Sequence, residues 1–368
     1  MLLTPGPTPV PEFVRKAMAD ITIHHRTEEF EAIFKNTREL LIELYDMPEV
    51  VMLASSGTGA MESCITNLTH KKALTINSGK FGERFGKICA AFGIDYTEIK
   101  NEWDTPVSVE AVVNAVKADS SIDAVFIQIC ESAGGLRHPV ELIAAKVKKI
   151  NKDIMIIADG ITAIGVEKID TTNLDAVITG SQKALMLPPG LAIIGLSNEA
   201  VAKIELKPRG YYFNLATEIK NQRKNTTAWT AATTLIIGLG AILEKLKADG
   251  FDKLFTQTAL RANATREALK AIGFDIYPKT PANAMTTVYT EQSSAIRKIL
   301  ENKYNVNIAG GQDHLAGKIF RINHMGLVED FEASWAVNAV ELTLDDLGIR
   351  TFDGTANKVF ALNMFKGN

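Results

Sequence analysis

Short runs that are apolar on both faces alternate with amphipathic stretches along the first 200 residues, and this alternation limits the possible folds most strongly. Strands buried on both faces need a covering layer on each side, and the amphipathic stretches between them supply helices. The pattern therefore predicts an α/β fold with a mostly parallel sheet flanked by helices. The expected strands are residues 50–55, 73–77, 124–130, 154–160, 176–181 and 191–196.

The pattern changes at about Phe251. A long helical stretch is followed by the short strands "AMTTVYT" and "KIFRINHM", mixed with helices expected at residues 294–304 and 333–347. This mixture predicts a smaller α+β domain. We expect three parts, namely an N-terminal segment 1–20 that reaches the active site and a dimer interface, a large domain 21–250 and a small domain 251–368.

Composition excludes several classes of protein. The chain has 368 residues, 46% hydrophobic and 23% charged, which is enough for two globular cores. A net charge of −3 supplies no basic field for nucleic acid. Three cysteines without a CxxC spacing are expected to be reduced core residues. Without a basic signal-peptide region or a membrane-spanning apolar run, we expect a cytoplasmic protein that binds no membrane.

Polar clusters follow the expected strands, where ligands of parallel sheets bind. Lys183 lies in the most unusual of them, "GSQKALMLPPG", directly after a buried strand. Burying an ammonium group is costly unless it is paired or neutralised. Lys183 is therefore either compensated by a neighbour or takes part in chemistry.

Each of the other clusters has a structural and a functional interpretation. "SSGTG" fits a helix start capped by Ser56 or Thr58, or a phosphate site built from free N–H groups. Asp159 fits a cap, an ion pair or the partner of a bound cation. Phe81 fits a core aromatic or a ring that stacks on a ligand.

The combination is more specific than its parts. A phosphate site, a stacking ring, a strand-end Asp159 and a strand-end Lys183 together suit pyridoxal 5′-phosphate. A lysine forms a Schiff base with its aldehyde. A carboxylate keeps its ring nitrogen protonated, so that the ring accepts electrons.

The same residues resemble class V aminotransferases of fold type I, in particular the alanine–glyoxylate / serine–pyruvate branch. The resemblance rests on "LLTPGPTPVPEFV", "SSGTGAMES", "NSGKFGERF", "ESAGG", "IIADGITAIG", "GSQKALMLPPGL" and "KIFRINHMG", and thus on most of the chain. It implies a seven-stranded sheet in the large domain and a homodimer whose subunits share active sites.

The resemblance also implies roles for individual residues. Lys183 would be the Schiff-base lysine and proton-transfer base, and Asp159 the partner of the pyridine nitrogen. The other implied contacts with the cofactor are Phe81 on the ring, Gly57, Thr58 and Gln182 on the phosphate, Ile161, and Ser132 near the phenolic oxygen. Ser132, Arg321 and Gly6 would bind substrate, with Arg321 clamping the α-carboxylate. Thr227, or alternatively Thr226, would reach the phosphate of the neighbouring subunit.

The sequence departs from the branch at several positions. Phe81 stands where tryptophan is common, Ala133 and Gly134 replace hydroxyl residues, and a proline often found near residues 225–232 is missing. Tyr211 and Tyr212 fall in a loop that contacts the neighbouring subunit in the branch, so they either line a shared site or pack in the interface.

The implied reaction is ping-pong transamination, from alanine or serine to glyoxylate or pyruvate. Aspartate, phosphoserine or 2-aminoethylphosphonate are alternative donors; His324 would either favour an acidic side chain or be structural. A cysteine desulfurase would need a cysteine late in the chain, and none follows Cys130. A non-catalytic binding protein with this fold would not need Lys183. A dehydrogenase would need a glycine fingerprint that is missing.

Overall fold

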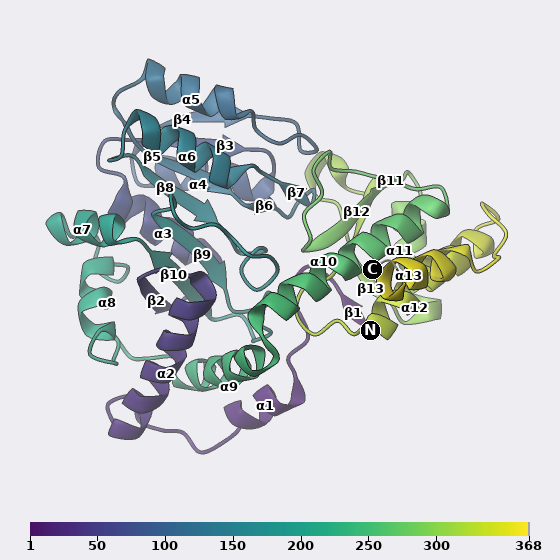
Figure 1. Cartoon of the computed structure of the whole chain (residues 1–368), viewed down its shortest axis with the longest axis horizontal. Helices are drawn as coiled ribbons and strands as arrows, with labels where there is room; N and C mark the ends of the chain where they lie inside the picture. Colours follow the sequence, from purple (N-terminus) through teal and green to yellow (C-terminus); the bar gives the residue numbers. More distant parts are fainter. Residues whose placement is uncertain (367–368) are drawn as a thin grey trace.

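The computed structural model describes residues 1–366 and contains two main sheets (Figure 1). The larger has seven strands in the order β2-β10-β9-β8-β5-β3-β4. Within it only β10 is antiparallel to its neighbours, so the prediction of a mostly parallel sheet is confirmed. Its strands are β2 (Glu49–Ala54), β3 (Lys72–Asn77), β4 (Asp95–Lys100), β5 (Ile122–Gln128), β8 (Met155–Asp159), β9 (Ala176–Gly180) and β10 (Leu191–Leu196).

Six of these strands lie where the apolar runs place them, and β4 was missed. Its sequence "DYTEIK" carries charges, and its residues are exposed or half-buried because it is the edge strand beside β3. An edge strand does not need to be apolar on both faces, so it lacks the pattern used to find the others.

Helices cover both faces of the seven-stranded sheet. Alternate strand residues enter two separate apolar cores, one under each layer of helices. One layer consists of α2 (Glu28–Tyr45), α5 (Val109–Ala118), α6 (Val140–Ile150) and α9 (Thr233–Asp249), and the other of α3 (Gly57–Leu68), α4 (Lys80–Ala91), α7 (Asn198–Leu206) and α8 (Leu215–Gln222). Within residues 1–366, no helix is long and apolar enough to cross a membrane.

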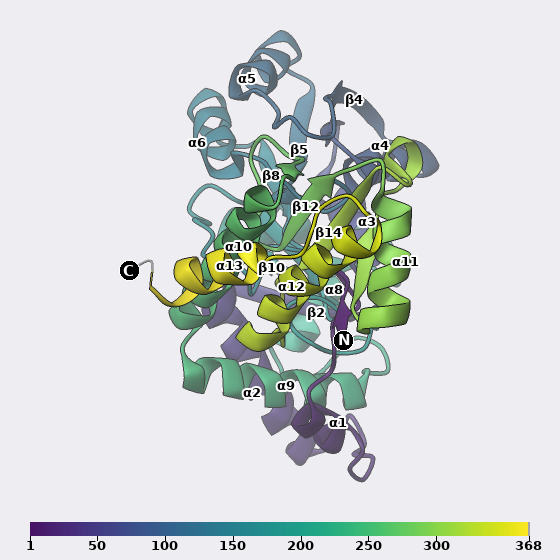
Figure 2. The same ribbon diagram turned by 90° about the vertical axis from the view of Figure 1, so that its right-hand side faces the viewer.

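The second sheet joins the beginning of the chain to its last third. Its order is β1-β13-β14-β12-β11, and β1 (Leu2–Leu3) pairs in parallel with β13 (Asn307–Gly310). Figure 2 shows the N-terminus beside this part of the molecule. The remaining elements here are β11 (Asp275–Ile276), β12 (Met285–Tyr289), β14 (Ile319–Asn323), α10 (Phe251–Ala271), α11 (Ser293–Tyr304), α12 (Asp330–Asp346), α13 (Thr355–Phe365) and the 3-10 turn η1 (Asp313–Leu315). The short α1 (Glu12–Met18) packs on α9, and β6 (Cys130–Glu131) pairs with β7 (Leu136–Arg137).

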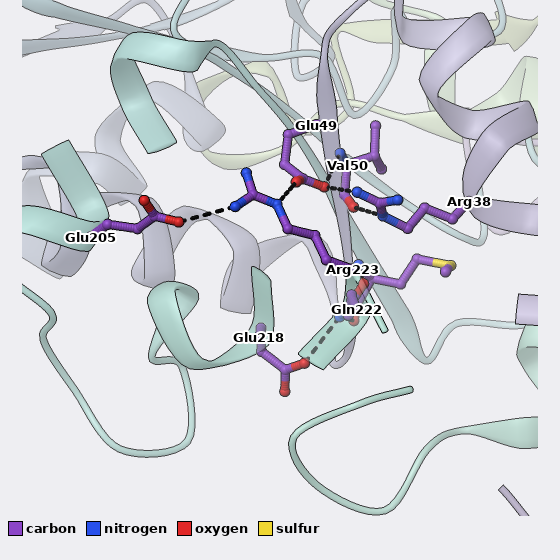
Figure 3. A network of polar contacts seen from close by, with 8 residues as sticks. Arg38, Glu49, Val50, Glu205, Glu218, Gln222 and Arg223 are labelled. Carbon is purple, nitrogen blue, oxygen red and sulfur yellow. Dashed lines mark hydrogen bonds and ion pairs between the residues drawn. The ribbon is translucent and has the colours of Figure 1, made fainter. Parts of the chain in front are cut away.

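Side chains protect the free edge of β2 (Figure 3). The Gln222 amide accepts from the Met52 N–H at 2.9 Å and donates to the Met52 carbonyl at 2.7 Å, as a neighbouring strand would. Buried Glu49 binds Arg38 with one oxygen and Arg223 with the other, the latter at 2.8 Å. Arg223 also reaches Glu205, at 3.2 Å. The edge is thus closed without another strand.

Candidate active site

Lys183 lies in the turn after β9, where the N-terminal segment holds it in place. The Thr8 hydroxyl donates to the Lys183 carbonyl at 2.7 Å, and the Thr8 N–H donates to the Gln182 carbonyl at 3.1 Å. The Lys183 amine donates to the Pro5 carbonyl. Burial, helped by the positive charge of Arg321, lowers the pKa of Lys183 to about 8. The amine therefore loses its proton far more easily than that of an exposed lysine.

Asp159 ends β8 as a buried carboxylate, and among residues 1–366 it has a single hydrogen-bond donor. The Ile161 N–H donates to Asp159 Oδ1 at 2.9 Å. Burial raises the pKa of Asp159 to about 6, although this N–H and the charges of Arg84 and Lys183 act in the opposite direction. Such a carboxylate needs a further cationic or N–H partner. A protonated pyridine nitrogen is such a partner.

The start of α3 offers free backbone N–H groups. Ser56 occupies the N-cap position, but its side chain makes no capping hydrogen bond. Within residues 1–366, the N–H groups of Gly57 and Thr58 have no hydrogen-bond partner. A Cβ on Gly57 would lie 2.5 Å from Ile161 Cδ1, so a larger residue here would have to displace the end of the Ile161 side chain. Two N–H groups at a helix start form a site for an anion such as phosphate.

Phe81 lies in the first turn of α4, and Arg84 covers it. The Arg84 guanidinium carbon is 4.8 Å from the centre of the Phe81 ring, and Arg84 donates to the Thr58 hydroxyl at 2.9 Å. Arg84 belongs to the segment "NSGKFGERF", but the sequence alone indicated no role for it. A cation beside the helix start adds positive charge to the proposed phosphate site.

Arg321 projects from β14 to the turn that carries Ser132. Its Nη1 donates to the Ser132 carbonyl at 2.6 Å, and its Nε and Nη2 donate to the Gly310 carbonyl at 3.1 and 2.6 Å. Of the five N–H groups of a guanidinium, two remain, one on each Nη, without a partner in residues 1–366. This pair suits a carboxylate. Burial lowers the pKa of Arg321 to about 10, so it stays charged at neutral pH.

Glu131 was also missed by sequence reasoning, although it precedes Ser132 in "ESAGG". It is fully buried and accepts hydrogen bonds from the backbone N–H groups of Phe81, Gly82 and Ala133. Burial raises the pKa of Glu131 to about 7, although these donors act against the increase. The signal available in the sequence was a glutamate at the end of an apolar run, directly before Ser132.

Gly6 and Gln182 complete the neighbourhood of the lysine. A Cβ on Gly6 would lie 2.6 Å from the Lys183 Nζ, so Gly6 lies directly against the amine. The Gln182 side-chain oxygen is buried and has no partner within residues 1–366. A buried amide oxygen without a donor, next to Lys183, is consistent with a ligand that donates a hydrogen bond there.

Other predicted residues lie apart from this cluster. The Thr227 hydroxyl donates to the Trp229 carbonyl at 2.5 Å, and the Thr226 N–H donates to the Asn221 carbonyl. Tyr211 and Tyr212 are exposed and pack on Trp229, with ring centres 5.0 and 6.1 Å from it. In a single chain these residues make no hydrogen bond to the cluster around Lys183 within residues 1–366.

His324 is fully buried, and its Nε2 lies 2.8 Å from the Thr286 hydroxyl. Burial, together with the charges of Arg266 and Arg261, lowers the pKa of His324 well below its ordinary value. The ring is therefore neutral near pH 7. It supplies no positive charge for an acidic substrate side chain.

Comparisons with known proteins show the family of the chain. The sequence profile of the aminotransferase class-V family matches residues 2–326. An uncharacterized aminotransferase of Helicobacter pylori is 46% identical over 98% of this chain and 98% of its own length. A serine–glyoxylate aminotransferase of Hyphomicrobium methylovorum is 30% identical over 99% of this chain and 95% of its own length. The crystal structure of an aspartate aminotransferase of subgroup IV from Thermus thermophilus has a TM-score of 0.88 at 30% identity, covering 94% of this chain and 99% of that one.

The seven-stranded sheet, with its lysine and aspartate at neighbouring strand ends, defines a transferase of fold type I that depends on pyridoxal 5′-phosphate. Within that class, the chain belongs to the class V aminotransferase family. The residues present fit the cofactor, since Gly57 and Thr58 offer N–H groups for the phosphate. Asp159 offers a carboxylate for the pyridine nitrogen, and Lys183 an amine for the aldehyde.

Proposed function

We propose that the protein transfers the amino group of a small amino acid, alanine or serine, to glyoxylate or pyruvate. The observation that carries the proposal is that Lys183 follows β9 while Asp159 ends the neighbouring strand β8. The positive charge of Arg321 and the negative charge of Asp159 both act on the pKa of Lys183. A substrate bound by its carboxylate at Arg321 would present its amino end toward Lys183. The relative from Hyphomicrobium methylovorum, named for serine and glyoxylate, supports this choice of substrates.

The residues of this chain have separate tasks in the proposed reaction. When bound, pyridoxal phosphate accepts the electrons released at the substrate Cα and carries the amino group between two half-reactions. Arg321 binds and orients the substrate carboxylate through its two free N–H groups. The neutral Lys183 amine would remove the Cα proton of the substrate, and the resulting ammonium group would return a proton to the cofactor carbon. Asp159 holds the proton on the pyridine nitrogen.

Aspartate is the second candidate donor, because the aspartate aminotransferase from Thermus thermophilus has 30% identity and a TM-score of 0.88. Its side-chain carboxylate would need a further cation. Neutral His324 does not provide one. We therefore favour the smaller donors over aspartate, phosphoserine and 2-aminoethylphosphonate.

Product analysis distinguishes these donors. Purified enzyme with pyridoxal phosphate and glyoxylate would be offered alanine, serine or aspartate at equal concentration, and glycine formation measured. We expect alanine or serine to give the highest kcat/KM, with Lys183→Ala as the inactive control. A higher kcat/KM with aspartate would show that aspartate is the donor instead. The assay would be repeated with pyruvate and serine or aspartate, and failure to form either glycine from glyoxylate or alanine from pyruvate would refute the proposal.

We further propose a homodimer in which Thr227 completes the partner's site. The exposed rings of Tyr211 and Tyr212, which pack on half-buried Trp229, support an interface there, since Tyr211 is 81% exposed. Mixing subunits tests this arrangement. A hybrid of Lys183→Ala and Thr227→Ala subunits contains one intact site if sites are shared, so activity should recover on mixing. No recovery, or a fully active monomer, would contradict it.

A further inference from the structure

Glu131 lies between two parts of the active site that are about 50 residues apart in the chain. One carboxylate oxygen, Oε2, accepts from the N–H groups of Phe81 and Gly82 at 3.1 and 2.8 Å. The other, Oε1, accepts from the Ala133 N–H at 2.9 Å. The side chain is fully buried. Both oxygens therefore act as acceptors away from solvent, where a missing partner is costly.

The approach of Glu131 to α4 is very close. A Cβ on Gly79 would lie 2.4 Å from the Glu131 carboxyl carbon, so the chain needs glycine at this point. The carboxylate binds the first N–H groups of α4, where the helix dipole favours a negative charge. It thereby fixes the first turn of the helix that carries the Phe81 ring.

The same carboxylate also fixes the turn that leads to Arg321. Ala133 follows Ser132, and the Ser132 carbonyl accepts from Arg321 Nη1 at 2.6 Å. Contacts therefore run without a break from the Phe81 backbone, through Glu131 and the Ser132 turn, to the Arg321 guanidinium. A displacement at Glu131 would shift the ring and the guanidinium relative to each other.

We propose that Glu131 is a positioning residue for transamination, which holds the Phe81 ring and the Arg321 guanidinium in one rigid frame. The inference rests on the proposed function, because it assigns the ring to the cofactor and the guanidinium to the substrate carboxylate. Cofactor and substrate would then be aligned by a single buried carboxylate. Small errors of alignment are costly in catalysis, since displacements near 1 Å reduce rates by roughly a hundredfold.

Glu131→Gln is the informative variant because it keeps the shape of the side chain. An amide has one acceptor oxygen and one NH₂ group, so the NH₂ must face either the Ala133 N–H or those of Phe81 and Gly82. Two donors then face each other, and one end of the connection is lost. Should this variant fail to fold, Glu131→Asp keeps both acceptors but is one methylene too short to reach both ends.

Glu341 provides a matched control far along the chain. It is also a fully buried carboxylate that binds a helix start, since it accepts from the N–H groups of Thr355 and Ala356 at 3.2 and 2.9 Å; it also binds Arg350 at 2.7 Å. We therefore expect both Glu341→Gln and Glu131→Gln to lower the melting temperature. Only Glu131→Gln should disturb the active site.

Four measurements test the proposal. Cofactor-free Glu131→Gln should bind pyridoxal phosphate about tenfold more weakly or worse, which corresponds to about 1.4 kcal/mol. The visible circular dichroism of the bound cofactor should change, and the donor KM should rise by more than kcat falls. In a Phe81→Ala background, Glu131→Gln should weaken cofactor binding by less than it does alone, because the ring is already missing.

The outcomes separate this inference from the proposed function. If Glu131→Gln lowers only the melting temperature, as Glu341→Gln does, Glu131 is a structural residue and the inference is wrong. If the wild-type enzyme transfers no amino group, the proposed function fails. Cofactor affinity and the dichroism of Glu131→Gln would still show whether Glu131 positions Phe81.

Discussion

Gly6→Ala should damage the active site much more than it damages the fold. Gly6 has φ +107, and an added Cβ would lie 2.6, 2.7 and 2.8 Å from Nζ, Cδ and Cε of Lys183. Backbone strain at such a position costs about 1–3 kcal/mol. Ordinary contact begins at 3.4 Å, so the lysine end or the N-terminal segment must move by about 0.8 Å. A shift of this size is expected to lower kcat/KM by roughly 10- to 100-fold.

Gly273→Ala is the matched control. Gly273 has φ +95, and an added Cβ would meet nothing within 4 Å among residues 1–366. Both variants should lose similar thermal stability through backbone strain, but only Gly6→Ala should lose activity and capture pyridoxal phosphate more slowly. Steady-state kinetics and melting curves measure the two effects separately. Wild-type kcat/KM in Gly6→Ala, with melting like that of Gly273→Ala, would refute the argued contact with Lys183.

Three further predictions concern the substrate clamp, the lysine and the edge of the sheet. Arg321→Gln removes two charge-assisted hydrogen bonds of about 1.5–3 kcal/mol each, so the donor KM should rise by at least roughly 100-fold. Reaction with a simple amine that lacks a carboxylate should slow far less, through the pKa of Lys183 alone, and an equal loss for both would refute the clamp. Lys183, with its pKa lowered to about 8, should capture pyridoxal phosphate faster as pH rises and the neutral amine forms. Stopped-flow absorbance should show the rate levelling above that pH; a rate that climbs for two further pH units would contradict it. Glu49→Gln removes the charge that binds Arg38 and the half-exposed Arg223, and should cost about 1.5–3 kcal/mol of unfolding free energy in denaturant titrations. Glu205→Gln, at the exposed end of this network, should change little.

The sheet and the cofactor were predictable because their signals are local. Six strands are apolar on both faces, and the polar residues Asp159 and Lys183 lie at the end of one of them and in the turn after another. The edge strand β4 was not predictable in this way, because it is charged and only half-buried. Local patterns therefore identify buried elements better than edges.

Contacts between distant segments were not predictable from the sequence pattern. The role of Glu131 depends on backbone N–H groups of Phe81 and Gly82, which no side-chain pattern encodes. Leu2–Leu3 pairs with a strand that begins at Asn307, and this pairing directs the following residues past Lys183. Resemblance alone suggested Gly6 as a site residue, and only the three-dimensional structure brings it against the amine.

The absorption spectrum of the purified protein with pyridoxal phosphate tests the central claim most directly. We expect a visible band from cofactor attached to Lys183, which disappears when alanine or serine is added and returns with glyoxylate or pyruvate. Lys183→Ala should lack the band of the attached cofactor. A wild-type protein that forms no band, or whose band no amino acid changes, would contradict the assignment of Lys183 and the proposed transamination.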